Sequence, residues 1–307
     1  MEKNITRYQW LDIAKGIAIL LMVIGHTSIP DPINRFIFAF HMPLFFIASG
    51  YCTNWSKLTY ADFVLHKCKT LLVPFVIYSA IVLIIGVSIN QMDAMQIITQ
   101  GWASNCYPLW FVPILFVGLL LAKAIMSIQN GKLRIIVWIL MALIGSFLKY
   151  KLIYLPYTLS PAFYASFLLI AGTYAKSLQT YILNPKWWVL SICFVITAII
   201  SHFWKVNMSW NTINPVVFIT IGAFAGTYLI FGTSALIDRF CKKAQQVLVF
   251  FGKETYVLLA FSSIIPSVLT TYVKVNGGGI YVITFLILII IINMKNCLNK
   301  LLGYKIL

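Results

Sequence analysis

The stretch WLDIAKGIAILLMVIGH, residues 10–26, decides the fold. Its apolar run is long enough to cross most of a bilayer core, which takes about 20 helical residues. Lys15 lies near its start and His26 ends it. A second run, FHMPLFFIASGY at residues 40–51, opens with His41. Ionisable side chains are costly inside a membrane and are retained there for function, so the two histidines predict a reaction centre.

The composition places the whole chain in a membrane. Of its 307 residues 61% are hydrophobic and only 10% are charged, whereas soluble domains carry about 25% charged residues. We therefore predict an all-α fold, a polytopic membrane helix bundle with about ten transmembrane helices. No long hydrophilic block remains for a soluble catalytic domain, so residues 1–307 are expected to form a single membrane-embedded domain.

The expected spans follow from the apolar runs and from the prolines near their edges. They lie near 11–29, 35–53, 70–90, 107–127, 133–148, 158–176, 186–203, 212–232, 246–270 and 278–294. The fifth is short, and a tilted or partly re-entrant segment is an alternative there.

The basic residues predict the orientation. With the N-terminus inside, only five of the 23 Lys and Arg residues fall on outer segments, and the other 18 fall on inner ones. This asymmetry follows the positive-inside rule and predicts a multi-pass protein of the cytoplasmic membrane with both ends inside. The net charge of +16 then reflects topology and contact with anionic membrane lipid, and we expect no nucleic-acid partner. The six cysteines show no metal-ligand spacing, so neither a metal site nor a disulfide framework is expected.

The histidines suit acyl transfer. His26 can act as the general base that takes the proton from an acceptor hydroxyl. His41 can be a second base or a donor to the forming oxyanion. The alternative for each is a hydrogen-bonded histidine at a helix end with no chemical role.

Lysines are the candidate contacts for an anionic donor. Lys15 lies on the same helix as His26, roughly 16 Å away along the axis, and suits the phosphates of acetyl-CoA arriving from the cytoplasm. Alternatively, Lys15 snorkels and pairs with Asp12. Lys67 and Lys69 precede a helix start expected at Pro74, and either grip donor phosphates or form a routine positive-inside loop.

Three further residues are candidates for binding the acceptor. Trp110 can stack on a sugar ring, although an interfacial tryptophan of the aromatic belt is the default interpretation. Asp12 and Asn34 are the polar candidates near the same helices.

These strings resemble the acyltransferase 3 family of integral membrane O-acyltransferases, and most of all its fucose 4-O-acetylase-like branch. The resemblance is strongest over residues 7–75 and implies about ten helices, an acyl-CoA donor and a carbohydrate acceptor. The family's basic-x10-His motif maps onto Lys15 and His26 and implies that His26 is catalytic. Its paired basic residues map onto Lys67 and Thr70, so the second match fails, and Lys69 is the nearby substitute. Many relatives have a histidine where this chain has Ser262.

The sequence thus predicts a bacterial membrane O-acetyltransferase. It would move an acetyl group from acetyl-CoA to a hydroxyl of a cell-envelope or exported carbohydrate, alongside polysaccharide biosynthesis machinery. The alternative is a polytopic transporter or flippase of a glycan precursor. Matched broken helices would favour that alternative, and the sequence contains no evident pair.

Overall fold

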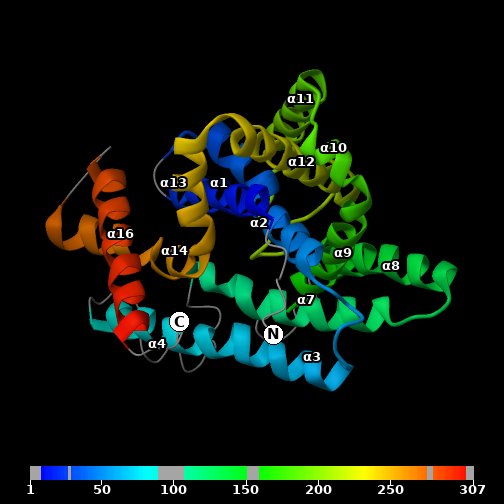
Figure 1. Ribbon diagram of the computed structural model, residues 1–307, viewed down its shortest axis with the longest axis horizontal. Coiled ribbons are helices and arrows are strands. Elements are labelled where there is room, and N and C mark those ends of the chain that lie inside the picture. Colours follow the sequence, from blue (N-terminus) through cyan, green and yellow to red (C-terminus); the bar gives the residue numbers. More distant parts are fainter. Residues whose placement is uncertain (1–7, 27–28, 89–106, 151–158, 275–278, 302–307) are drawn as a thin grey trace.

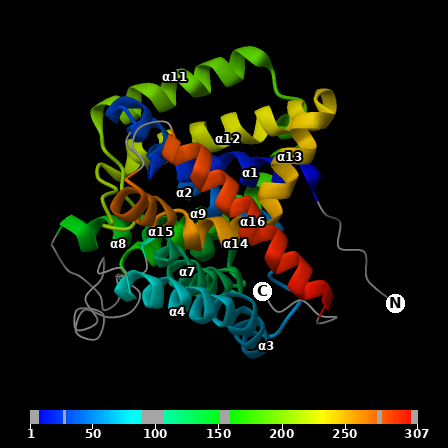
Figure 2. The ribbon, with the colours of Figure 1, turned by 90° about the vertical axis from the view of Figure 1, so that its left-hand side faces the viewer.

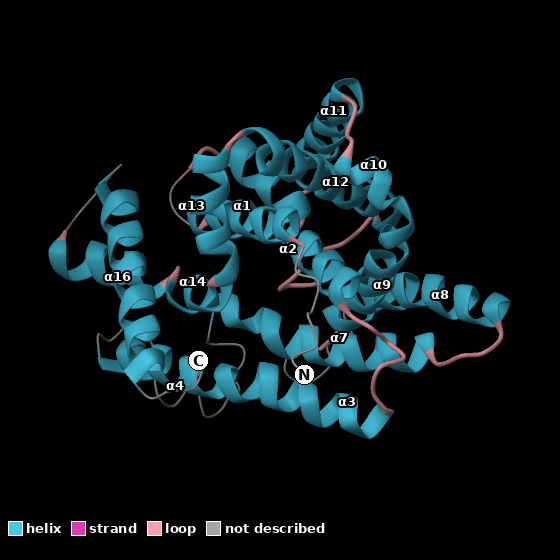
Figure 3. Ribbon diagram, in the orientation of Figure 1, coloured by secondary structure: helices cyan, strands magenta, loops and turns pink. Residues whose placement is uncertain are grey.

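The computed structural model describes residues 8–26, 29–88, 107–150, 159–274 and 279–301. Within these ranges the fold consists of helices and loops, with one isolated bridge between Asn207 and Thr212 (Figures 1 and 3). The all-α prediction is therefore confirmed. The helices are α1 Gln9–Gly25, α2 Asp31–Cys52, α3 Tyr60–Lys67, η1 Cys68–Leu72, α4 Val73–Ser88, η2 Tyr107–Trp110, α7 Phe111–Met126, α8 Gly131–Tyr150, α9 Pro161–Tyr174, η4 Ala175–Leu178, α10 Gln179–Leu183, α11 Trp187–Phe203, α12 Val216–Phe240, α13 Lys242–Lys253, α14 Thr255–Phe261, α15 Ile264–Val268, η5 Leu269–Val273 and α16 Gly279–Leu301.

The helices α1 and α2 form the centre of the bundle. They pack on each other and on α12, while α13 lies on α1 and α9 lies on α2 (Figures 1 and 2). Glycines permit the closest of these contacts. A side chain at Gly50 of α2 would collide with the backbone of Leu169, and one at Gly172 of α9 with the backbone of Ile47. Small residues let membrane helices approach in this way.

The outer helices carry apolar side chains on their exposed faces. Ile84 of α4 is 67% exposed, Phe194 of α11 is 53% exposed and Val282 of α16 is 61% exposed. Apolar faces of this extent belong in lipid. Seven helices of the described chain are long and apolar enough to cross a membrane, and α11 is a shorter apolar helix. The protein is therefore a multi-pass membrane protein, while the count of ten spans and the orientation stay predictions.

The third span begins earlier than expected. Its helical course starts at Tyr60 instead of residue 70, because Thr59 caps it by accepting a hydrogen bond from the Asp62 backbone N–H (3.2 Å). Pro74 lies inside the course instead of at its start. A π-helical turn, η1, precedes it. The wider turn accommodates the proline ring and the hydrogen bond that is missing because proline has no backbone N–H. Lys67 and Lys69 therefore lie on a helix and not in a loop.

The segment expected as one span at 246–270 is divided. The helix α13 ends at Lys253, and α14 starts afresh at Thr255. Glu254 at the break forms an ion pair with Lys295 of α16, which fixes the change of direction. The spanning part is accordingly Thr255–Val273. The fifth expected span, at 133–148, corresponds to α8. Its apolar stretch Gly131–Leu148 is long enough to cross a membrane, so the re-entrant alternative is not supported.

Candidate active site

One face of α1 lines two neighbouring cavities. Met22 and His26 line the first and Lys15 and Ile19 line the second. These four residues follow the spacing of a single helical stripe, so they share one side of α1. The helix itself therefore connects the lysine to the histidine.

The first cavity, which we call the histidine cavity, has a volume of about 250 Å³. It brings together three residues that the sequence singled out, namely His26, His41 and Trp110. They come from the end of α1, the middle of α2 and the turn η2. Its remaining lining residues are Met22, Phe38, Met42, Pro108, Asn207, Met208, Ser209 and Leu259.

The two imidazoles are held in the same way. Nδ1 of His26 lies 2.8 Å from the carbonyl oxygen of Met22, and Nδ1 of His41 lies 2.9 Å from that of Ile37. A carbonyl only accepts hydrogen bonds, so the proton of each neutral ring resides on Nδ1. Each Nε2 is then an unprotonated base. For a neutral His41 this favours acceptance of a hydroxyl proton over donation to an oxyanion.

The rings flank Phe38 on two sides. Its ring centroid lies 6.0 Å from that of His26 and 4.8 Å from that of His41. His41 is 2% exposed, whereas His26 is exposed at the end of α1. The cavity thus has one base in its buried wall and one at its accessible edge.

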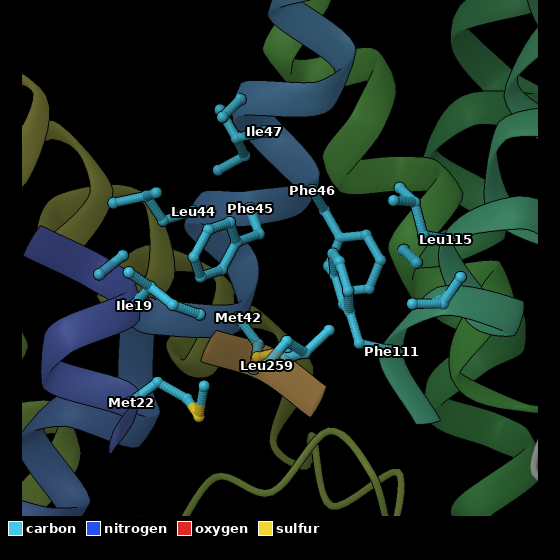
Figure 4. Packing of buried hydrophobic residues seen from close by; sticks show 14 of the residues in the cluster. Ile19, Met22, Met42, Leu44, Phe45, Phe46, Ile47, Phe111, Leu115 and Leu259 are labelled. Carbon is cyan, nitrogen blue, oxygen red and sulfur yellow. The ribbon is translucent and has the colours of Figure 1, made fainter. Parts of the chain in front are cut away.

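The second cavity, which we call the lysine cavity, is narrow and mainly apolar, with a volume of about 160 Å³. Lys15 at one end pairs with Asp12, with 2.7 Å between Nζ and Oδ1. Leu259 of α14 lines both this cavity and the histidine cavity. Figure 4 shows Leu259 between the side chains of α1, α2 and α7. A slim apolar chain passing Leu259 would therefore join Lys15 to the histidines.

A group of lysines surrounds the Lys15 end. Lys15, Lys67 and Lys176 each interact electrostatically with the thiol of Cys52, at the end of α2. Lys67 also lies over the ring of Phe63, 5.4 Å from its centroid. Lys69, by contrast, is an exposed residue of η1. Of the three lysines predicted to bind the donor, Lys15 and Lys67 therefore lie near each other, whereas Lys69 is exposed to solvent.

Two polar candidates lie apart from the histidine cavity. Asp12 is buried near the start of α1, where its carboxylate forms an ion pair with Lys15. Asn34 donates from Nδ2 to the carbonyl oxygen of Gly25 at 2.7 Å. This hydrogen bond links the end of α1 to α2. It thereby helps to position His26, which follows Gly25.

The loop between α11 and α12 was missed by sequence reasoning. Its residues Asn207 and Ser209 line the histidine cavity, and Asn207 Oδ1 accepts a hydrogen bond from Ser209 Oγ at 2.6 Å. Asn211 anchors the loop by donating to the carbonyl oxygen of Gly145 in α8, at 2.9 Å. The sequence did contain a signal for this loop, because asparagine and serine cluster there between two apolar runs and such clusters are typical of polar loops.

The family comparison covers most of the chain. A family model described as an acyltransferase domain, that of acyltransferase 3, matches residues 8–294. Both cavities and every candidate residue lie within that range. Neither a curated protein nor a solved structure matches the chain.

Proposed function

Since the chain belongs to the acyltransferase 3 family and is a membrane acyltransferase, we propose that it transfers the acetyl group of acetyl-CoA to a carbohydrate hydroxyl. One observation carries the proposal: the side chains of His26, His41 and Trp110 line a cavity that shares Leu259 with the lysine cavity. An acyl donor and a hydroxyl acceptor can thus meet beside a base.

The transfer step uses the free nitrogen of His26. The acceptor sugar stacks on Trp110, and Nε2 of His26 takes the proton of its hydroxyl as the oxygen attacks the thioester carbonyl carbon. The carbon–sulfur bond then breaks, and the leaving thiolate takes the proton from the imidazolium. The products are the acetyl ester and CoA. Nε2 of His41 accepts a hydrogen bond from a neighbouring hydroxyl and so orients the sugar.

The donor lies along α1. Lys15, Lys67 and Lys69 bind its phosphates at the predicted cytoplasmic end, since ammonium groups pair with phosphate. The slim thioester arm follows the apolar lysine cavity past Leu259. The acceptor is a cell-envelope or exported glycan, such as a surface polysaccharide or a lipid-linked oligosaccharide, and the protein acts in the cytoplasmic membrane with polysaccharide biosynthesis enzymes.

The test compares two histidine variants. His26→Ala should lower the rate of acetyl transfer by about 10²- to 10⁴-fold, the usual contribution of a general base. His202→Ala is the matched control, because His202 is an exposed histidine of α11 that does not line the histidine cavity. Loss of acetyl groups is read by mass spectrometry of the glycan. Unchanged acetylation in folded His26→Ala would overturn the mechanism and would revive the transporter alternative.

A further inference from the structure

A third cavity lies beside the loop that follows α2. It has a volume of about 580 Å³, within the range of small-molecule sites. It lies between that loop and the ends of α7 and α9, at the end of the bundle predicted to face the cytoplasm. The lining residues are Thr53, Asn54, Trp55, Ser56, Lys123, Met126, Ser127, Gln129, Thr173 and Lys176.

Two ammonium groups face this cavity from different helices. Lys123 is only 7% exposed, and its Nζ donates to the carbonyl oxygens of Trp55 and, at 3.0 Å, Leu58. Lys176 donates from Nζ to the carbonyl oxygen of Thr53 at 3.1 Å. Each ammonium also lies over an aromatic ring, with Nζ of Lys123 5.9 Å from the centroid of Phe63 and Nζ of Lys176 5.9 Å from that of Tyr51. An ammonium has three donors, and the hydrogen bonds use two donors of Lys123 and one of Lys176.

Among the described residues, the lining of the cavity carries no group of opposite charge. Its lining includes no carboxylate, and each carboxylate in the described part of the chain has a partner elsewhere. These pairs are Asp12 with Lys15, Asp31 with Arg35, Asp62 with Thr59, Asp238 with Gln245 and Glu254 with Lys295. Carbonyl dipoles only partly offset a buried positive charge, which is costly without an anion.

We propose that the cavity binds a phosphate group, held by Lys123 and Lys176. The amides of Asn54 and Gln129 supply further polar groups in the wall, as a phosphate ester requires, while the hydroxyl of Ser56 donates to Asn54 Oδ1 at 3.0 Å. The phosphate belongs either to a nucleotide or to an anionic lipid headgroup. The nucleotide source rests on the proposed function, because CoA is the product of the proposed donor and Lys176 also belongs to the lysine group around Cys52. The lipid source does not depend on that function.

The experiment measures both phosphate sources on the purified full chain in phosphatidylcholine nanodiscs. One arm measures binding of CoA by equilibrium dialysis. The other measures the rise in melting temperature when phosphatidylglycerol replaces part of the phosphatidylcholine. Lys176→Gln removes one ammonium and should weaken one of these responses about tenfold, the value of a charge-assisted hydrogen bond. Lys132→Gln, which changes an exposed lysine outside the cavity lining, is the control.

The outcomes separate the sources and the two proposals. Weaker CoA binding in both Lys176→Gln and Lys123→Met assigns a nucleotide phosphate to this cavity, because Lys123 is not in the lysine group around Cys52. Weaker CoA binding in Lys176→Gln alone locates the effect at the Lys15 end and contradicts the nucleotide source. Loss of the phosphatidylglycerol response assigns a lipid headgroup. If both responses equal those of wild type and of Lys132→Gln, the lysines only cap carbonyls and the proposal is wrong. Lys123→Met repeats the test at the buried position. The binding readouts stay valid even for a protein that transfers no acetyl group.

Discussion

The junction at Leu259 offers a direct test of the path from Lys15 to the histidines. Leu259→Trp adds about six non-hydrogen atoms where a cavity of about 160 Å³ meets the histidine cavity. That cavity has room for only about five water volumes of about 30 Å³ each. An indole there should block the thioester arm. Since misplacement of a reacting group by about 1 Å can cost 10²-fold, kcat/KM for acetyl-CoA should fall at least about 100-fold.

Destabilisation alone should not produce this loss. Overpacking a core position costs about 1–3 kcal/mol, which is less than the 5–15 kcal/mol stability of a typical domain. Ile265→Trp is the matched control, because Ile265 is also 7% exposed but lines neither cavity. The assay is acetyl transfer in detergent with melting temperature measured in parallel. Full activity in Leu259→Trp would refute a donor path along α1.

Three other predictions test the surroundings of the site. Asn207→Ala should raise KM for the acceptor about tenfold, by loss of about 1.4 kcal/mol of hydrogen bonding, with KM for the donor unchanged in steady-state kinetics. Glu254→Gln should destabilise the protein by about 3–5 kcal/mol because it strands a buried charge, and adding Lys295→Met should recover part of the melting temperature. Bound CoA should slow maleimide labelling of Cys52, next to Lys15, but not of the exposed Cys241.

Local sequence patterns predicted the parts of the fold that depend on local forces. The apolar run before His26 forms α1, a helix of 17 residues that is not among the seven candidate spans, because burial of apolar side chains and backbone hydrogen bonding within one segment favour a helix. The position of Trp110 just before α7 followed from the same reasoning. His41 was expected at the start of a helix but lies in the middle of α2, because α2 already begins at Asp31. That Trp110 lines the same cavity as His26 and His41 was not predicted, because it depends on how helices distant in the sequence pack.

Tertiary contacts decided the features that the sequence pattern missed. The break after α13 depends on the ion pair between Glu254 and Lys295, 41 residues apart. The lining of the histidine cavity by Asn207 depends on the anchoring of Asn211 to Gly145, 66 residues away. Neither pairing leaves a periodic signal. Hydropathy patterns are blind to such contacts because they report one segment at a time.

The spacing of Lys15 and His26 along α1 bears on the proposed donor. Gly16 in the middle of α1 fits against the backbone of Leu248 in α13, and Asn34 holds the carbonyl of Gly25, so the helix is held at its middle and at its C-terminal end. The 11-residue rise from Lys15 to His26 is then a constant of roughly 16 Å. A donor with its acyl group next to its phosphate cannot contact Lys15 and reach His26 together. A thioester on a long arm can, so with Lys15 as the proposed phosphate contact this spacing supports the proposed acetyl-CoA over an acyl phosphate.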